Sequence, residues 1–411
     1  MTLPATSVIV VSRGRPAHLR LCLAALGMQD HPEFEIILVA DAEGLAQCPD
    51  LPAKRVAYDV PNISEARNLG IAEAAGEVIA FIDDDAVAEP GWLSRLSAPF
   101  ANPEVLAATG WTRDRNGFSW QQRSQRIHRN SWCHTIPSIG PEVQLLPPEN
   151  GRPVSTLGTN CAFRTSALRQ IGGFDSAFAF HLDESDVNLR MADVFPEALT
   201  AIVPGAEVIH AQAGSERRKQ NRVPQDLTLE GRSTSLFTRR HGRPVPISEA
   251  LRRKRRRLLR HMLDGQLDPF QLAPVLASLQ KGLTEGARTP LPDPPPPRED
   301  NPSPFLPASA RPGPLLVLGG WHWQAAALRR RAARAMAEGH IVTLILFTPT
   351  FVSHRVQMTE AGWFEQTGGL WGASAPGDLP AKFWRLKARL TRETKMIHSR
   401  RNLSHSPAVS A

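Results

Sequence analysis

Residues 81–93 read FIDDDAVAEPGWL, with three consecutive aspartates directly behind a run of apolar residues. Like charges this close repel one another and are costly to remove from water unless a positive partner lies among them. Carboxylate oxygens suit Mg²⁺ or Mn²⁺, and such an ion completes its shell with water and phosphate oxygens. Two interpretations follow: a solvated acidic turn that caps the next helix, or a cation site that recruits a diphosphate.

The segments before the aspartates alternate between strand and helix patterns. Strand-like runs lie at 7–11, 34–40 and 78–82, and helix-forming patterns lie at 16–26 and 63–75. This order predicts an α/β fold with a mostly parallel sheet flanked by helices. Ligands bind outside the carboxyl ends of the strands in such sheets, so Arg13, Asp41 and Asp83–Asp85 are expected at one crevice. That placement favours the cation site.

Composition is ordinary for a globular protein and predicts one or two folded units. The chain has 411 residues, of which 42% are hydrophobic and 21% charged. Its four cysteines form no C-x-x-C pair, and its first residues lack the pattern of a secretory signal. No apolar run is long enough to span a bilayer. We therefore expect a cytoplasmic protein.

The net charge of +8 is unevenly distributed. Residues 1–210 hold 16 Lys and Arg against 25 Asp and Glu, whereas residues 211–411 hold 32 against 15. Residues 251–260 read LRRKRRRLLR, and residues 289–314 are rich in proline. The basic run indicates either a solvated helix face or a peripheral contact with anionic lipid on the cytoplasmic side of the membrane.

Four parts of the chain are predicted from these shifts in composition. They are a main domain at 5–242, a basic helical appendage at 243–286, a proline-rich linker at 287–314 and a small α/β segment at 315–400. The last part has a β-α-β pattern but lacks the full G-x-G-x-x-G fingerprint of dinucleotide binding, so its role is unassigned.

Five motifs, taken in order, resemble those of the inverting family 2 glycosyltransferases, which have a GT-A fold. They are SVIVVSRGRP, the N-x-S-x-A-R-N-x-G segment at 62–70, FIDDDAVAEPGWL, GGFD at 172–175 and LDESDVNLR at 182–190. The resemblance covers roughly residues 5–212, about half of the chain. It implies a nucleotide-sugar donor, Mn²⁺ or Mg²⁺, and a single displacement by a hydroxyl of a glycan or lipid-linked acceptor.

The resemblance assigns the donor and metal residues. The family's D-x-D element falls on Asp83 and Asp85, with Asp85 as a direct metal ligand, Asp83 as a contact to ribose or metal, and Asp84 between them in the donor site. Asp41 follows the second strand, where the family contacts the nucleobase, although a helix cap is the simpler interpretation. Arg67 would meet a phosphate or the base edge, or else be an ordinary surface arginine.

Two further assignments depend on position. Arg13 is placed in the donor site, although the chain reads VSRGR where the family has a Thr-Tyr-Asn-Arg-like segment. His210 ends a strand-like segment at the place of a metal-binding histidine in the family, although a lone histidine is more often structural. TLGTNCAF at 156–163 would line the sugar and acceptor pocket with the GGFD turn.

The second acidic cluster supplies the base that inverting transfer needs, because a sugar hydroxyl attacks only as its proton is removed. The family reads Glu-Asp-x-Asp-Leu before an arginine, and here the first two acids are swapped to Asp183 and Glu184. We take Glu184 as the base and Asp183 as the alternative, while a solvated acidic helix face remains a third interpretation. Asp186 and Arg190 have the spacing of a helical ion pair. His181 is a candidate for placing the acceptor.

Two other classes of protein compete with this interpretation. A metal-dependent nucleotidyltransferase would also use aspartates, but no G-x-x-x-x-G-K-[ST] loop is present. A protein that binds nucleic acid or another anionic surface would explain the basic second half, but its arginines lack interleaved aromatic residues and a recognition motif. We therefore expect no nucleic-acid partner.

Overall fold

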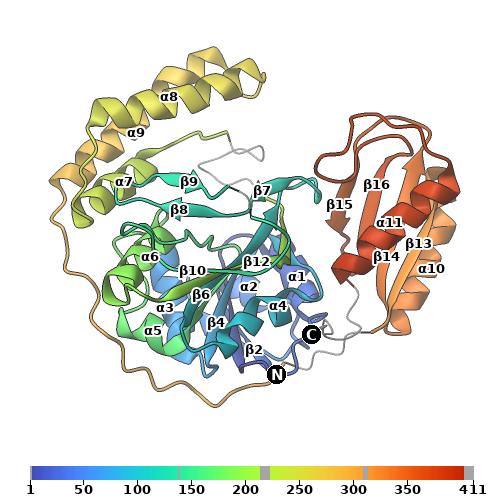
Figure 1. The fold of residues 1–411 in the computed structure, drawn as a ribbon, viewed down its shortest axis with the longest axis horizontal. Coiled ribbons are helices and arrows are strands. Elements are labelled where there is room, and N and C mark those ends of the chain that lie inside the picture. The colour runs from blue at the N-terminus through green and yellow to red at the C-terminus, as the bar shows by residue number, and fades with distance from the viewer. Residues whose placement is uncertain (1, 138, 213–222, 309–312, 402–411) are drawn as a thin grey trace.

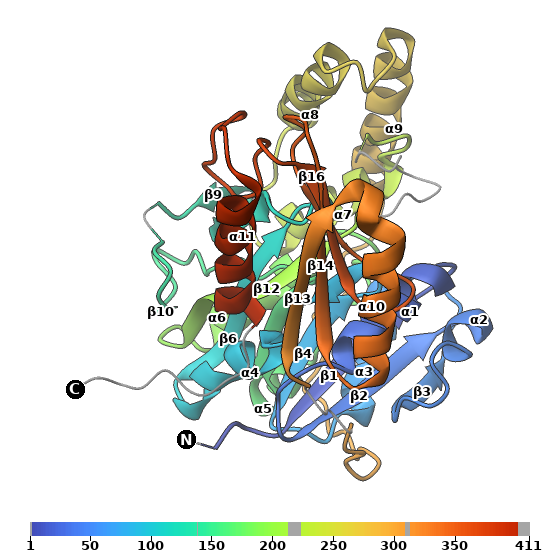
Figure 2. The ribbon, with the colours of Figure 1, turned by 90° about the vertical axis from the view of Figure 1, so that its right-hand side faces the viewer.

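The computed structural model describes residues 2–137, 139–212, 223–308 and 313–401. A large central sheet and its helices form the first domain, and a smaller sheet with two long helices forms a second domain beside it (Figure 1; Figure 2). A pair of helices projects from the first domain on the side opposite the second domain in the view of Figure 1.

The parallel part of the large sheet follows the predicted strand and helix order. In sheet order its strands are β3 (Lys54–Ala57), β2 (Phe34–Ala40), β1 (Thr6–Ser12) and β4 (Val78–Asp83). The crossovers contain α1 (Pro16–Leu26), α2 (Ala42–Leu45) and α3 (Ile63–Glu73). The prediction of an α/β fold with a mostly parallel sheet is confirmed, because strands of β-branched and apolar residues alternate with amphipathic helices.

The remaining strands extend the sheet in mixed directions. They are β5 (Ala86–Ala88), β6 (Val105–Arg113), β7 (Trp120–Gln122), β10 (Gln144–Leu146), β11 (Cys161–Arg164) and β12 (Leu199–His210). Between them lie α4 (Trp92–Ser97), η1 (Ala98–Ala101), β8 (Gln125–Ile127), β9 (Cys133–Thr135), α5 (Thr165–Gln170) and α6 (Asp183–Val194). β12 pairs antiparallel with β5, with His210 opposite Ala86. This pairing brings the end of β12 to the aspartates.

Two apolar layers cover the sheet. Val8 and Val10 belong to one cluster, with α1 and α4, and Ile9 belongs to the other, with α3 and α5. Successive side chains of a strand point to opposite faces, so a strand buried on both sides is apolar throughout. The layers fix the edge at which β1, β2 and β4 end.

Three helices form the appendage to the first domain: α7 (Thr228–Arg240), α8 (Ile247–Leu263) and α9 (Pro269–Arg288). α7 packs closely on α9 because Gly282 has no side chain, and a Cβ there would overlap the carbonyl oxygen of Thr228. α8 and α9 form the projecting pair (Figure 1). Near their connection, Leu263 is 81% and Phe270 is 90% exposed.

The proline-rich segment follows the surface of the first domain. Its described residues 289–308 form neither helix nor strand. Backbone and side-chain bonds hold it: Ala308 N donates to Phe34 O at 2.8 Å and Leu306 N to Glu35 Oε2 at 3.0 Å. Proline fixes φ and removes a backbone donor, which favours an extended strap, and further side-chain bonds such as Ser303 Oγ to Glu73 Oε2 at 2.6 Å add to its anchoring.

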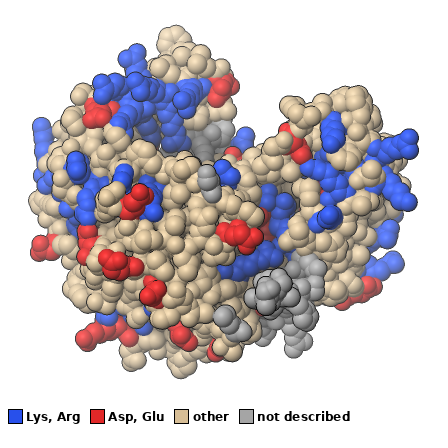
Figure 3. Space-filling view, in the orientation of Figure 1, with Lys and Arg blue, Asp and Glu red and all other residues tan. Residues whose placement is uncertain are grey.

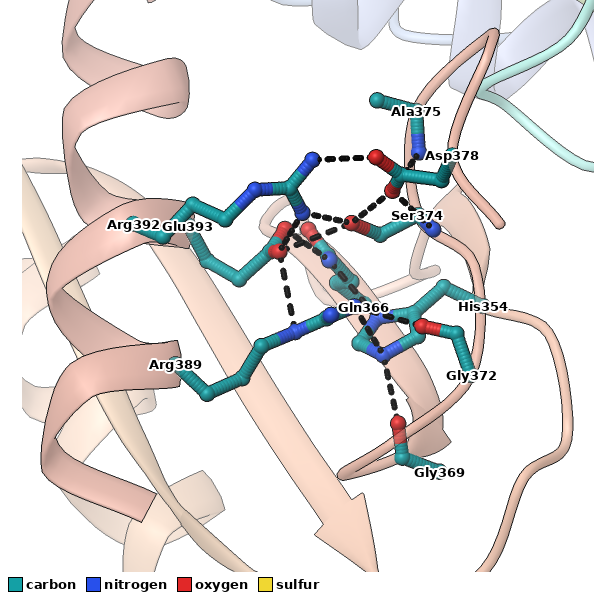
Figure 4. Close-up of polar contacts among 10 residues, drawn as sticks. All are labelled: His354, Gln366, Gly369, Gly372, Ser374, Ala375, Asp378, Arg389, Arg392 and Glu393. Carbon is teal, nitrogen blue, oxygen red and sulfur yellow. Dashed lines mark hydrogen bonds and ion pairs between the residues drawn. The ribbon is translucent and has the colours of Figure 1, made fainter. Parts of the chain in front are cut away.

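The second domain has a four-stranded sheet in the order β13-β14-β16-β15. Its elements are β13 (Leu315–Trp321), η2 (His322–Gln324), α10 (Ala325–Ala337), β14 (Ile341–Thr348), β15 (Arg355–Met358), β16 (Phe364–Gly369) and α11 (Leu386–Arg401). A buried polar network ties the loop after β16 to α11 (Figure 4). At its centre, Glu393 accepts hydrogen bonds from Gln366 at 2.8 Å and Ser374 at 2.7 Å. The network makes this domain a compact unit around its own core.

Among the helices of the described residues, none is both long and apolar enough to cross a lipid bilayer.

Candidate active site

Asp83, Asp85 and His210 form a compact group at the carboxyl edge of the large sheet. Their candidate ligand atoms all lie within 4.8 Å of one another. His210 Nε2 lies 3.1 Å from Asp85 Oδ1 and 3.9 Å from Asp83 Oδ2. Asp83 is the last residue of β4 and Asp85 lies in the turn after it, while the pairing of β12 with β5 brings His210 beside them. The three predicted metal ligands are therefore neighbours in space.

The environment of His210 fits a metal ligand. Its Nδ1 lies 2.9 Å from Gln121 Oε1, and because that oxygen can only accept, Nδ1 carries the proton. Nε2 then presents a lone pair to the two aspartates. This nitrogen is buried and has no well-directed hydrogen-bond partner among the described residues. A buried imidazole nitrogen beside two carboxylates suits a divalent cation, and Gln121 is the outer partner that orients such a ligand.

Asp84 points away from this group. Its carboxylate accepts from Ser12 Oγ at 2.8 Å and Arg15 Nη1 at 3.0 Å. Burial raises the pKa of Asp84 to about 7, although the charge of Arg15 opposes that rise. Arg15 also lies 3.7 Å from Asp85 Oδ2. Arg15 therefore supplies part of the positive charge that the aspartates require. The sequence analysis identified neither Ser12 nor Arg15 as a partner of the aspartates.

Arg67 links the metal group to the second acidic cluster. Its guanidinium lies 3.5 Å from Asp83 Oδ1, donates to Glu184 Oε1 at 3.0 Å and contacts Asp183. The side chain is only 3% exposed and packs over the Phe81 and Phe174 rings at 5.7 and 5.1 Å. Arg67 is therefore a buried arginine, and the interpretation as an ordinary surface residue is wrong.

Asp183 and Glu184 lie in the first turn of α6, where the helix dipole stabilises negative charge. The chain enters this helix through Leu182, which adopts a left-handed φ of 67°. The side chain of Asp183 is 4% exposed and that of Glu184 is 20% exposed. Glu184 is thus the acid more open to an incoming molecule.

The pKa values of the two acids are shifted in opposite directions. Burial and the charge of Glu184 raise the pKa of Asp183 well above its usual range. Burial also works to raise the pKa of Glu184, but Arg67 and the hydrogen bond from Asp183 lower it below its ordinary value. These opposite shifts make Glu184 the stronger acid of the two, so it ionises before Asp183 as the pH rises.

The predicted ion pair of Asp186 and Arg190 positions this helix. Arg190 Nε donates to Asp186 Oδ2 at 2.7 Å, and His241 Nε2 lies 3.1 Å from Asp186 Oδ1. Arg190 Nη2 donates to the carbonyl of Gly173 at 2.7 Å. The GGFD turn is therefore tied to α6, which explains why these motifs occur together.

The loop TLGTN before β11 fits between the two acidic groups. Thr159 Oγ1 donates to Asp83, and a Cβ at Gly158 would overlap both the Glu184 carboxylate and the Arg67 guanidinium. Asn160 anchors the loop, since its Oδ1 accepts from Trp92 Nε1 at 2.8 Å. A glycine is needed at residue 158 because the backbone approaches Glu184 closely.

The other predicted residues lie apart from this cluster. Arg13 is exposed and pairs with Asp59 at 2.7 Å. Asp41 caps α2 by accepting from Gly44 N at 2.8 Å, and its second oxygen accepts from Gly14 N at 2.6 Å. Both follow β1 and β2 at the same sheet edge. His181 is half-buried, and burial lowers its pKa.

Comparison with known proteins identifies the class. Residues 7–172 match the family model described as Glycosyl transferase family 2. An uncharacterized protein of Mycobacterium tuberculosis is 28% identical over 198 residues, covering 46% of this chain and 62% of that protein. The N-acetylglucosaminyl-diphospho-decaprenol L-rhamnosyltransferase of Mycobacterium tuberculosis is 26% identical over 319 residues, covering 63% of this chain and 98% of that protein.

Among solved structures, one that is similar is the mannosyltransferase PcManGT from Pyrobaculum calidifontis in complex with GDP-Man and Mn²⁺. The match has a TM-score of 0.39 and 17% sequence identity, and it covers 68% of this chain and 70% of the mannosyltransferase chain. The chain thus spans less than two thirds of the uncharacterized mycobacterial relative and nearly all of the rhamnosyltransferase.

The first domain has the α/β fold with a large, mostly parallel central sheet that the sequence predicted. Residues 7–172 match the model of glycosyl transferase family 2, the family that the order of the five sequence motifs indicated.

Proposed function

We propose that this protein is an inverting, metal-dependent glycosyltransferase that moves a sugar from a nucleotide diphosphate to an acceptor hydroxyl. The observation that carries the proposal is the position of Arg67, which contacts the carboxylate of Asp83 on one side and the Asp183–Glu184 pair on the other. The Arg67 side chain therefore contacts both a proposed metal ligand, Asp83, and the proposed base, Glu184.

In this reaction the acceptor oxygen forms a bond to the anomeric carbon while the bond from that carbon to the diphosphate oxygen breaks. Glu184 takes the proton of the acceptor hydroxyl, because it is ionised and the more exposed of the two acids. Asp183 keeps its own proton and holds Glu184 in place. A divalent cation on Asp83, Asp85 and His210 would neutralise the charge of the departing diphosphate.

The donor is proposed to lie along the carboxyl edge of the sheet. Arg13 and Asp41 are assigned to the nucleoside end, since they follow β1 and β2, and Asp83 and Arg67 to the ribose and diphosphate. Asp84 contributes by fixing Arg15, its partner at 3.0 Å, beside the donor.

The acceptor is proposed to be a glycan or a lipid-linked molecule, with the protein in peripheral contact with an anionic membrane on its cytoplasmic face. Lys and Arg gather over α8 (Figure 3), where Arg252, Arg255 and Arg256 are exposed. Exposed Leu263 and Phe270 lie where α8 joins α9. Cations beside exposed apolar side chains suit a surface of anionic headgroups.

The test is a panel of UDP-, GDP- and dTDP-sugars incubated with Mn²⁺, with hydrolysis and transfer products separated and their anomeric configuration determined. We expect one donor to be consumed only when the metal is present, and inversion in the transfer product. Retention of configuration would overturn the inverting mechanism. Salt-sensitive oligonucleotide binding without any turnover would instead favour the nucleic-acid-binding alternative.

A further inference from the structure

The second domain packs directly on β5, which begins immediately after Asp85, and on β12, which ends at His210. Val87 of β5 and Ile209 of β12 are opposite one another in the register and belong to one apolar cluster with Val356, Met358 and Phe364 of the second domain. Successive residues of a strand point to opposite faces. Ile209 therefore faces the second domain while its neighbour His210 faces the aspartates.

A buried ion pair joins the same strands to the last helix. Glu89, immediately after β5, is fully buried, and its carboxylate accepts from Arg401 Nε at 2.6 Å and Nη2 at 3.1 Å. Arg401 also donates from Nη1 to Thr343 Oγ1 at 2.7 Å, so β14 and α11 both hold it. Burial acts to raise the pKa of Glu89, but the charge of Arg401 acts against it, and the pKa of Glu89 lies below its usual value.

A second set of polar contacts reaches β12. Glu207 accepts from Arg113 Nε at 2.6 Å and lies 3.4 Å from Arg400 Nε. Arg95 Nη1 donates both to the carbonyl of Gly205 at 3.0 Å and to that of Arg400 at 3.1 Å. α11 is therefore bonded to β12 and β5, the two strands whose pairing places His210 beside the aspartates.

The backbones of the two domains also meet. Val356 N donates to Asn116 O at 2.8 Å. Gly117 has φ +75° and lies against Val356, where a Cβ would overlap the valine backbone. The segment 114–122 leads into β7, which carries Gln121, the partner of His210 Nδ1. The second domain thus contacts β5, β12 and the loop that leads into β7.

We propose that residues 313–401 are a positioning domain for the metal group, and that Arg401 is the positioning residue that fixes the β5–β12 strand pair through Glu89. The inference rests on the proposed metal-dependent function. It assigns a role to the part of the chain that lies outside the family match. A shift of this strand pair would separate His210 from Asp83 and Asp85, since the pairing of β5 with β12 places the histidine beside the aspartates.

The experiment compares Arg401→Gln with Arg330→Gln in the full chain. Arg330 is an exposed residue of α10, so the control makes the same change in the same domain away from the interface. The first measurement is amide hydrogen exchange at 86–88 and 205–210. We expect faster exchange in Arg401→Gln alone, and equal exchange in both variants would overturn the coupling whether or not the protein binds metal.

The second measurement is the affinity for Mn²⁺ without donor, by titration calorimetry. We expect Arg401→Gln to weaken binding by about tenfold, the lower end of the loss for outer partners of metal ligands, because Arg401 acts on His210 through the strand pair, and Arg330→Gln to leave it unchanged. If Arg401→Gln does not fold, Arg400→Gln, which removes only the contact at 3.4 Å to Glu207, gives the milder test with the same expected direction. Equal affinity in parent and variants would overturn the positioning role, whereas a parent that binds no Mn²⁺ would overturn the metal site itself.

Discussion

Arg67 Nη1 donates a hydrogen bond to Glu184 Oε1 over 3.0 Å, although the two residues are far apart in the sequence. The same guanidinium lies 3.5 Å from Asp83 Oδ1. The buried arginine thus sets both the charge of the candidate base and its separation from the metal group. A single side chain makes the two halves of the proposed reaction depend on each other.

Replacing the base should lower turnover without lowering donor affinity. We expect Glu184→Gln to reduce kcat by roughly 10²- to 10⁴-fold, the loss typical of a positioned base, with nucleotide-sugar and Mn²⁺ affinity nearly unchanged. Asp183→Asn should be milder because the raised pKa of Asp183 favours its neutral form, which a neutral asparagine resembles. Steady-state kinetics with a fixed donor would measure both, and the reverse ranking would transfer the role to Asp183.

Removing a metal ligand should abolish metal-dependent donor binding. Asp85→Ala and His210→Ala each delete one of three clustered ligand atoms, so Mn²⁺ binding should be lost while the circular dichroism spectrum stays that of the parent. Asp50→Ala is the matched control because Asp50 is exposed and distant from the group in sequence. Retained Mn²⁺ affinity in both ligand variants would rule out this site.

The pH dependence of activity should change when the charge of Arg67 is removed, because that charge lowers the pKa of Glu184. The arginine lowers the pKa of Glu184, so the base remains ionised to lower pH than an ordinary glutamate would. Arg67→Gln should raise that pKa and move the acid limb of kcat/KM to higher pH, in addition to lowering its plateau. An unmoved acid limb, measured beside Arg330→Gln, would mean that Glu184 is not the titrating base.

A side chain larger than that of glycine at residue 158 should disturb the candidate active site. A Cβ there would overlap the Glu184 carboxylate and the Arg67 guanidinium, so Gly158→Ala should displace these side chains and lower kcat. Gly140→Ala is the control, since a Cβ at Gly140 meets nothing within 4 Å. We expect similar melting temperatures for the two variants, and equal activity would show that the site tolerates the added methyl group.

The membrane contact should depend on the position of the charges and not only on their number. Replacing Arg252, Arg255 and Arg256 by Gln should weaken binding to anionic vesicles by about 1 kcal/mol per residue near the surface. The control replaces Arg330, Arg331 and Arg334 of α10, three exposed arginines, with the same loss of charge. Cosedimentation that falls equally in both triple variants would indicate only a general charge effect.

The periodicity of the sequence was sufficient to predict strands and helices of the large sheet. Residues 34–40 form β2 and residues 16–26 form α1 with the predicted bounds, because apolar spacing and a proline in the first turn act locally. The candidate metal and base residues were also recognisable, since oxygen-rich clusters after apolar strands have few structural uses. Their roles stay predictions until the variants are measured.

Only the tertiary structure decided how these residues are grouped. Asp84 is directed to Ser12 and Arg15 while Asp83 and Asp85 face His210, because the chain turns sharply between β4 and β5. The burial of Arg67 and the pairing of Arg401 with Glu89 depend on contacts between distant segments. A sequence determines which side chains are available and which local elements they form, but the charge state and partner of a buried group depend on what packs around it.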